Sequence, residues 1–348
     1  MLFLLFFVVL NSIGQDLQRV DSLVTELEIQ ETDSVRCRIM LEIASELKTT
    51  DTINALDFLE QGKSIAEGLT DKSYQGRCFE ILGEMHTHFG LYDLAIIEYD
   101  RALAFYYEAD NDIGYYETLK DKGNVHLFKS EYPQALNYYE TALDYYRRND
   151  MVFGASRCLN NIGIIYKNRG QYVEALTAYD ESIKYLNIEE DPMQIAQGYI
   201  NMGNVFVYLG SYERALEYFK LALDIAERQS RKKEIALCLL NSGVVNNKCS
   251  NFSEANNLYR RALSVGKELG DPVMISNCLI NIGANYSEMG RLEEGLQYVE
   301  RGMDMKVELG DSRTISNCLI HMAEIHYKME DFDRAIELLR EAIPVKEA

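Results

Sequence analysis

Five histidines, seven cysteines and many carboxylates are the residues of this chain whose types could support chemistry. His86 and His88 are two residues apart, so their rings lie about 200° apart around a helix and do not converge on one metal ion. His321 and His326 are five apart, unlike the pair in a zinc-binding HExxH helix. The sequence contains no glycine-rich phosphate loop and no GxSxG motif. It therefore predicts no catalytic residue, no metal site and no cofactor, and we expect the chain not to be an enzyme.

The net charge restricts the kinds of partner that the chain can bind. The chain of 348 residues has 35 Lys and Arg against 55 Asp and Glu, a net charge of -20. Phosphate backbones and anionic lipids would repel such a surface. We therefore expect a protein or peptide partner, no nucleic acid and no direct membrane binding by the folded part. Carboxylate pairs on helix surfaces of so acidic a chain are interpreted as a solvated face.

The chain segments that would position any binding residue follow a repeat in the sequence. One glycine recurs every 40 residues, and an alanine continues the series: Gly83, Gly123, Gly163, Gly203, Gly243, Gly283 and Ala323. A small residue follows at +12 and an aromatic or large aliphatic residue at +16, as in Ala135 and Tyr139. Such a period indicates a stack of one supersecondary unit.

This pattern resembles the tetratricopeptide repeat. The third glycine unit shows it well, with Leu159 and Gly163 followed by Tyr166, Ala175 and Tyr179. The period is 40 residues rather than the usual 34 or so, and the Trp and closing Pro of the common motif are missing. The chain therefore resembles the long-repeat variety, including the extracytoplasmic arrays of regulators of the Bacteroidetes type. The resemblance implies an all-α, right-handed α-solenoid of helix-turn-helix repeats, with about seven clear units and one degenerate N-terminal unit.

The turns predict where the helices begin and end. We expect helix pairs near 72–89 and 91–109, and further pairs at intervals of 40. Residues 16–70 hold a leading helix and the degenerate repeat, and 71–348 hold the array, whose last unit is truncated. Four aspartates are predicted N-caps: Asp71, Asp191, Asp271 and Asp311. Four glycines are predicted to end first helices: Gly90, Gly170, Gly210 and Gly290.

The cysteines follow the same repeat. Five of them stand five residues before the repeat glycine or alanine: Cys78, Cys158, Cys238, Cys278 and Cys318. Packed helices lie about 8–10 Å apart, beyond the Cα separation that a disulfide tolerates. These cysteines are predicted to be small buried apolar residues. Cys249 lies outside this register and is predicted to be an exposed thiol.

The resemblance also implies a binding groove. In arrays of this family, positions -6, -2, +1 and +5 relative to the repeat glycine line the concave side; we call them the groove stripe. Nine of its 28 positions are Asn, against about two expected from 22 Asn in 348 residues (28 × 22/348). The predicted peptide-binding residues are Arg157, Asn161, Asn168, Gln197, Asn201, Asn204, Tyr208, Asn241, Asn277, Asn281 and Asn317.

Two roles remain open for these amides. An amide both donates and accepts, so a column of Asn side chains can hydrogen bond to the backbone of an extended peptide. Alternatively, the amides bond one another or neighbouring helices and stiffen the stack.

Residues 1–14 are predicted to be a signal peptide. Met1–Leu10 is an uncharged apolar run, too short for a membrane span of about 20 residues. Ser12 and Gly14 then supply the small residues of a cleavage site. The alternative is an amphipathic or buried N-terminal helix, although the run has no polar face. We expect export to the periplasm or the outside, with membrane anchoring if the chain is a fragment.

Two functional hypotheses follow. The first is a non-enzymatic scaffold that binds an extended peptide or partner segment in its concave groove. The second is the ligand-sensing N-terminal part of a larger signal-transduction protein, a histidine kinase or a helix-turn-helix regulator. Neither the ligand nor the oligomeric state follows from the sequence.

Overall fold

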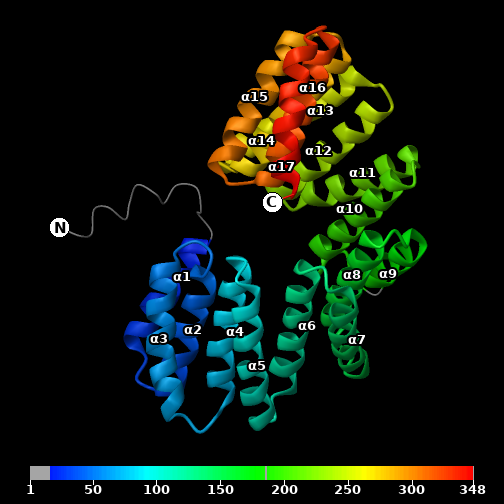
Figure 1. Ribbon diagram of the computed structural model, residues 1–348. Coiled ribbons are helices and arrows are strands. Elements are labelled where there is room, and N and C mark those ends of the chain that lie inside the picture. The colour runs from blue at the N-terminus through cyan, green and yellow to red at the C-terminus, as the bar shows by residue number, and fades with distance from the viewer. Residues whose placement is uncertain (1–15, 185, 348) are drawn as a thin grey trace, which may run out of the picture. The chain divides into compact units, whose positions relative to one another are not determined.

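The computed structural model describes residues 16–184 and 186–347, which form seventeen α-helices and no strands (Figure 1). The predicted all-α solenoid of helix-turn-helix repeats is thereby confirmed. The chain divides into two compact units, which we call unit 1 (Met1–Tyr185) and unit 2 (Leu186–Ala348). The predicted signal peptide, residues 1–14, lies outside the described residues.

Unit 1 holds nine helices, coloured blue to green in Figure 1. They are α1 (Asp16–Ile29), α2 (Asp33–Leu47), α3 (Thr52–Gly68), α4 (Ser73–His88), α5 (Tyr92–Glu108), α6 (Asp112–Phe128), α7 (Tyr132–Arg148), α8 (Val152–Asn168) and α9 (Tyr172–Lys184). Helices α4 and α5 agree with the predicted pair to within one residue at each end. Helix α1 packs against α2, as expected for a leading helix.

Unit 2 holds the remaining eight helices, which form four antiparallel pairs. They are α10 (Pro192–Tyr208), α11 (Tyr212–Arg228), α12 (Lys232–Lys248), α13 (Phe252–Leu269), α14 (Pro272–Glu288), α15 (Leu292–Glu308), α16 (Ser312–Lys328) and α17 (Phe332–Glu347). None of the helices in the described residues is long and apolar enough to cross a membrane.

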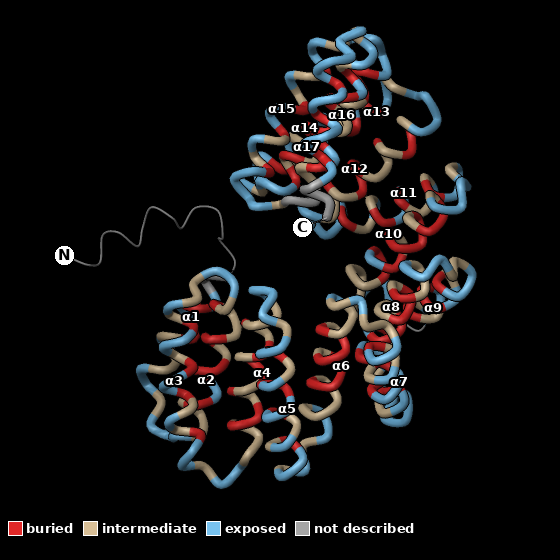
Figure 2. The backbone as a smooth tube through the Cα atoms, viewed as in Figure 1, coloured by how far each residue is buried: buried red, intermediate tan, exposed pale blue. Residues whose placement is uncertain are grey.

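Even-numbered helices form one layer in each unit. From α4 onward these are the first helices of the repeats, and each of them touches the next even-numbered helix of its own unit. Consecutive odd-numbered helices make no such contact in the described parts of the chain. Closer spacing on the even side makes that side the inner one, so the first helices, on which the groove stripe lies, form the inner layer of each unit. Burial is concentrated on the faces between helices (Figure 2).

A glycine–aromatic contact fixes the five pairs from α4–α5 to α12–α13. A Cβ on Gly163 would lie 2.6 Å from the ring of Tyr179, and one on Gly203 would lie 2.5 Å from the ring of Phe219. No side chain fits in that space, so glycine allows the first helix to approach the aromatic residue of the second. This explains why the glycine at position 0 and the large residue at +16 recur together.

The helix ends agree only in part with the predicted terminal glycines and aspartate N-caps. The four predicted terminal glycines have left-handed φ values of 71° to 76°. Serine, aspartate or glutamate adopts the same conformation at six other turns. Among the predicted caps, Asp271 and Asp311 accept backbone N–H groups of their helices, at 2.9 and 3.1 Å. Asp191 makes no such bond, because its carboxylate instead accepts the backbone N–H of Asn187. Asp71 precedes the N-cap of α4 by one residue, but its carboxylate accepts the backbone N–H of Ser73, the first residue of that helix, at 2.8 Å.

The cysteine predictions are confirmed. All five in-register cysteines are buried and free, and Cys249 is exposed. Burial raises the pKa of each buried thiol, that of Cys37 for example to about 11, which keeps it protonated and unreactive.

Candidate functional site

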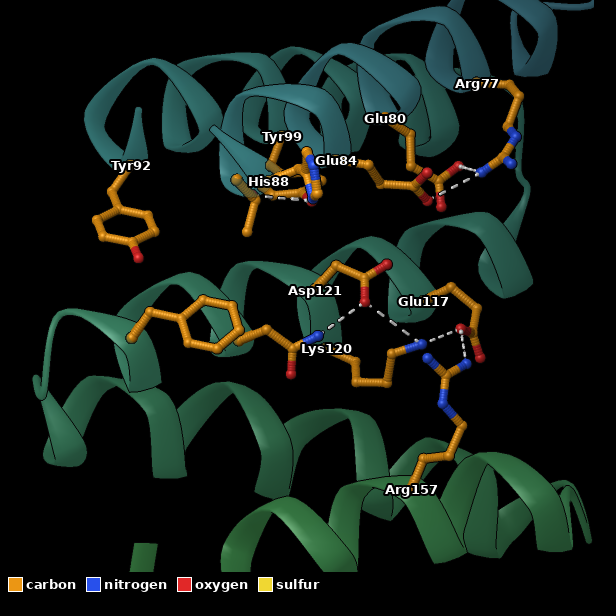
Figure 3. A pocket seen from close by; sticks show the side chains of 13 residues that line it. Arg77, Glu80, Glu84, His88, Tyr92, Tyr99, Glu117, Lys120, Asp121 and Arg157 are labelled. Carbon is orange, nitrogen blue, oxygen red and sulfur yellow. Dashed lines mark hydrogen bonds and ion pairs between the residues drawn. The ribbon is translucent and has the colours of Figure 1, made fainter. Parts of the chain in front are cut away.

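A charged cavity of about 710 Å³ lies on the inner face of unit 1, between α4, α6 and α8 (Figure 3). Its thirteen lining residues are Arg77, Glu80, Glu84, Thr87, His88, Tyr92, Tyr99, Glu117, Lys120, Asp121, Asn124, Phe128 and Arg157. Eight of the thirteen belong to the groove stripe. The stripe therefore lines a hollow on the inner face of this unit.

Helix α4 contributes a carboxylate pair held by two cations. Arg77 Nη1 lies 2.9 Å from Glu80 Oε2 and 3.5 Å from Glu84 Oε1. Lys48 Nζ of the neighbouring repeat reaches Glu84 Oε2 at 2.5 Å. The buried phenol of Tyr106 donates a hydrogen bond to Glu80. Each carboxylate of α4 thus has a partner that fixes its position.

Helix α6 contributes a second pair around a buried lysine. Lys120 is only 1% exposed and pairs with Glu117, with Asp121 Oδ1 3.6 Å away. Arg157 of α8 approaches Glu117 at 3.5 Å, and Tyr146 donates its phenol hydrogen to the same carboxylate. Burial would raise the pKa of Glu117, but these donors hold it below its usual value.

Asp121 is the carboxyl with the least compensation. Burial raises its pKa to about 7; Lys120 opposes this rise, and the nearby charges of Glu80 and Glu84 add to it. Carboxylate oxygens of Glu80, Glu84 and Asp121 lie within 4.8 Å of one another. The interpretation of surface carboxylates as a solvated face is therefore wrong here, because side chains from two helices converge over a partly buried hollow.

The other end of the cavity is aromatic. Figure 3 places His88 and Tyr92 away from Arg77 and Arg157. The rings of Tyr92 and Phe128 are stacked, with centroids 6.1 Å apart. The cavity thus joins a charged end to an aromatic end, a combination that suits a ligand with both polar and apolar groups.

The predicted peptide-binding residues all lie on first helices. Arg157, Asn161 and Asn168 are on α8, Gln197, Asn201, Asn204 and Tyr208 on α10, Asn241 on α12, Asn277 and Asn281 on α14, and Asn317 on α16. Only Arg157 lines the charged cavity. Asn201 is 8% exposed, and the others are half-buried or exposed.

Several of these amides bond to a neighbouring amide or to their own helix. Asn161 Nδ2 donates to Asn124 Oδ1 of the preceding first helix at 2.8 Å, and Asn241 donates to Asn204 at 3.4 Å. Asn281 donates to the carbonyl oxygen of Asn277 at 3.0 Å. Such bonds are expected if the amides stiffen the stack. They leave part of each amide's capacity unused, so the ligand-binding role stays a prediction.

The sequence interpretation missed Glu80 and Lys120. Both stand three residues before the repeat glycine, where unit 2 has Ile200, Leu240, Ile280 and Ile320. A charged residue at a position that is aliphatic throughout unit 2 is a sequence signal for a buried ion pair. It was overlooked because the groove stripe does not include this position.

Comparison with protein families gives one match. The profile described as Tetratricopeptide repeat matches residues 115–187, 194–268 and 275–348. No curated protein matches the chain.

Comparison with solved structures gives several similar solenoids. The apo form of the quorum sensor NprR from B. thuringiensis is 15% identical, with a TM-score of 0.74 over 95% of this chain and 93% of NprR. A Rap protein complexed with competence and sporulation factor is 19% identical, with a TM-score of 0.70 over 94% of this chain and 91% of that one. A Signal Transduction ATPase with Numerous Domains from Pyrococcus horikoshii, with a tetratricopeptide repeat sensor, is 13% identical, with a TM-score of 0.66 over 95% of this chain and 52% of that one. At such identities the likeness shows the fold alone.

Proposed function

Because the chain belongs to the tetratricopeptide repeat family, we propose that it is a non-enzymatic scaffold that binds an extended peptide or partner segment along the inner faces of its first helices. The observation that carries this proposal is that eight of the thirteen residues around the charged cavity belong to the groove stripe. The Rap conjugation gene regulator of the plasmid pLS20, 18% identical with a TM-score of 0.65 and solved in complex with the Phr* peptide, supports a peptide as the kind of ligand.

The two units, each taken by itself, offer a peptide different chemistry. The amides on α10 to α16 can bond to the peptide backbone, which every sequence offers. The cavity in unit 1 instead has fixed charges and an aromatic end, so it can select side chains. Arg157 and Phe128 are exposed members of this cavity, at 44% for the arginine side chain and 57% for the phenylalanine.

Peptide display against the purified chain tests this function. Three variants are compared with the parent: Asn201, Asn241 and Asn281→Ala together, Phe128 and Arg157→Ala together, and Leu94 and Arg148→Ala on second helices as the control. We expect the first to weaken binding of all selected peptides and the second to change which peptides are selected. Equal selection by all four proteins would overturn the proposal, and circular dichroism checks that each variant is folded.

A sensory role within a larger protein is the second candidate. The observation in its favour is that 95% of this chain aligns with 52% of a signal-transduction ATPase that carries a tetratricopeptide repeat sensor. In that case a peptide would be the signal, and the output would come from another domain. Sequencing the gene beyond the codon for Ala348 separates the two candidates, because a downstream kinase or helix-turn-helix domain favours the sensor.

We propose further that the chain is exported, on the basis of the apolar run Met1–Leu10 and the small residues that follow it. Cell fractionation with an antibody to the folded array tests this. Recovery of the chain with its N-terminal fourteen residues intact from the cytoplasm would contradict it.

A further inference from the structure

Helix α5 of unit 1 carries an apolar patch on its solvent-exposed side. Leu91 is the residue before the helix, and Leu94 and Ile97 lie in its first two turns. Their exposed fractions are 47%, 46% and 47%. We call these three residues the outer patch. Exposing neighbouring aliphatic side chains to water is costly, and such patches mark interaction sites.

The other repeats show that the fold does not need apolar residues at these places. The outer patch occupies positions +8, +11 and +14 relative to the repeat glycine, and in the other seven helix pairs all three equivalent positions are polar. The polar residues are Asp51, Asn54 and Asp57; Glu131, Gln134 and Asn137; Gln171, Glu174 and Thr177; Ser211, Arg214 and Glu217; Asn251, Glu254 and Asn257; Arg291, Glu294 and Gln297; and Asp331, Arg334 and Glu337. Helix α5 has complete helix pairs before and after it. The apolar residues are therefore a feature of this helix and not of a terminal repeat.

A helix from another chain can reach the outer patch. Helix α5 packs against α4 and α6, and in the described residues it makes no close backbone contact with α3 or α7, its neighbours in the layer of second helices. Its outer side is therefore accessible between them, as helix packing requires. The outer patch shares no residue with the groove stripe or with the charged cavity. A contact at the outer patch would thus leave the peptide-binding side of unit 1 free.

Two charged residues flank the centre of this face. Asp93 stands four residues before Ile97 and Arg101 four residues after it, so all three side chains lie along one side of α5. The Asp93 side chain is 89% exposed, although Lys129 approaches it at 3.0 Å. The Arg101 side chain is 56% exposed, although it pairs with Glu98 at 3.2 Å. Each charged group therefore has capacity for one more hydrogen-bonding partner.

This arrangement is complementary to itself. When two copies of α5 lie antiparallel with Ile97 on a two-fold axis, each Asp93 is opposite Arg101 of the second copy, because both are four residues, about 6 Å, from the axis. The outer patches of the two copies then cover each other near the axis. The apolar run Met1–Leu10 has no charged group to offer Asp93 or Arg101. A second copy therefore matches this face better than the apolar run does.

We propose that the outer patch is the contact of a homodimer, in which the α5 helices of two copies of this chain pack antiparallel about a two-fold axis at Ile97. A single pair of helices buries less than the roughly 1,200–2,000 Å² of a standard interface. The dimer is therefore weak, with a dissociation constant on the order of 10–100 µM. It forms on the outer layer of unit 1, so it does not compete with a peptide on the inner face.

Sedimentation velocity of the purified full chain, at concentrations on both sides of that dissociation constant, tests the proposal. We expect a reversible monomer–dimer equilibrium whose dissociation constant rises at least about tenfold in Leu94→Glu, because the carboxylate must lose its hydration in the contact. The matched control is Leu221→Glu on α11, an equally exposed leucine at 46% outside the outer patch, which should dimerise like the parent. A parent that stays monomeric, or equal dimerisation of Leu94→Glu and the parent, would overturn the proposal.

A charge exchange tests the antiparallel pairing itself. Arg101→Glu alone and Asp93→Arg alone bring like charges together, so each variant should dimerise at least about tenfold more weakly than the parent. An equimolar mixture of the two variants restores both contacts between opposite charges and should form a heterodimer. A mixture that stays monomeric contradicts the pairing.

Removal of residues 1–14 tests the other occupant, the apolar run. The dimer should persist without these residues, and its loss would show that the run, and not α5, forms the contact. Circular dichroism shows whether each variant keeps its helices, and all the substitutions are at exposed sites, where folding is tolerant.

Discussion

The two units share one repeat, but they have different residue types at the same buried position. Three residues before the repeat glycine, unit 1 has Glu80 and Lys120, which are 5% and 1% exposed. Unit 2 has Ile200 and Leu240 at equally buried places. The scaffold therefore tolerates either an ion pair or an aliphatic side chain at one depth, provided that its surroundings change as well.

The compensating change lies on the second helix. At the position 23 residues after the repeat glycine, unit 1 has Tyr106 and Tyr146, whose phenols hydrogen bond to Glu80 and Glu117. Unit 2 has Ala226 and Gly266 there. In these four repeats a large polar partner accompanies a charge, and a small partner accompanies an aliphatic residue, so volume and hydrogen bonding change together. The next repeat of unit 2 departs from this, because it has Ile280 and the buried Lys306 at the same two positions.

The largest test of this contrast is Lys120→Met. Removing the buried cation leaves the carboxylates of Glu117 and Asp121 without their shared partner. We therefore expect the unfolding free energy of unit 1 to fall by about 3–5 kcal/mol at pH 8. The matched change Leu240→Met in unit 2 keeps an apolar side chain of similar volume and should cost less than about 1.5 kcal/mol. Native-state hydrogen exchange of fragments from α6 and α12 measures both losses. Equal losses would mean that the ion pair adds nothing specific to unit 1.

The second test uses the pKa of Asp121. A carboxyl whose pKa is raised to about 7 on folding binds its proton more tightly in the folded chain. Its stabilising contribution is full below the unfolded pKa near 4 and is lost as the pH rises to about 7. Asp121→Asn removes this titration. Between pH 5 and pH 8 we expect the variant to gain, relative to the parent, on the order of 2 kcal/mol of unfolding free energy.

Glu117→Gln is the control for that measurement. Glu117 lies on the same helix and pairs with the same lysine, but its pKa is lowered. A lowered pKa gives stability that is present above the unfolded value near 4 and is lost as the pH falls through the folded value. The cost of Glu117→Gln should therefore stay constant between pH 5 and pH 8. A pH-dependent difference of the same sign in both variants would contradict the assignment to Asp121.

Much of the fold could be predicted because it is encoded locally and repeatedly. The 40-residue period fixes the helix pairs, and the glycine at position 0 with the large residue at +16 fixes how each pair packs. The division after Tyr185 was not predicted. In the structure it follows a short second helix, since α9 runs for 13 residues while α5 and α7 run for 17.

The site was harder to predict than the fold. In unit 1 the groove stripe supplies eight of the thirteen residues around the charged cavity, because helical periodicity alone decides which residues share a face. The charged network needed more, since Lys48 comes from the repeat before that of Arg77 and Glu84 and reaches Glu84 only after stacking. The rise in the pKa of Asp121 likewise depends on carboxylates of another helix. Such contacts leave no spacing in the sequence that marks them.

The smallest expected effect concerns the amides, in which the two units differ least. Asn161→Ala in unit 1 removes a 2.8 Å bond to Asn124 and should cost about 1 kcal/mol. Asn241→Ala in unit 2 removes a 3.4 Å bond to Asn204 and should cost less, because so long a contact is weak. Urea denaturation followed by hydrogen exchange in α8 and α12 measures the difference. If Asn241→Ala costs as much as Asn161→Ala, the amides of unit 2 stiffen the stack, and the case for keeping them as peptide contacts is lost.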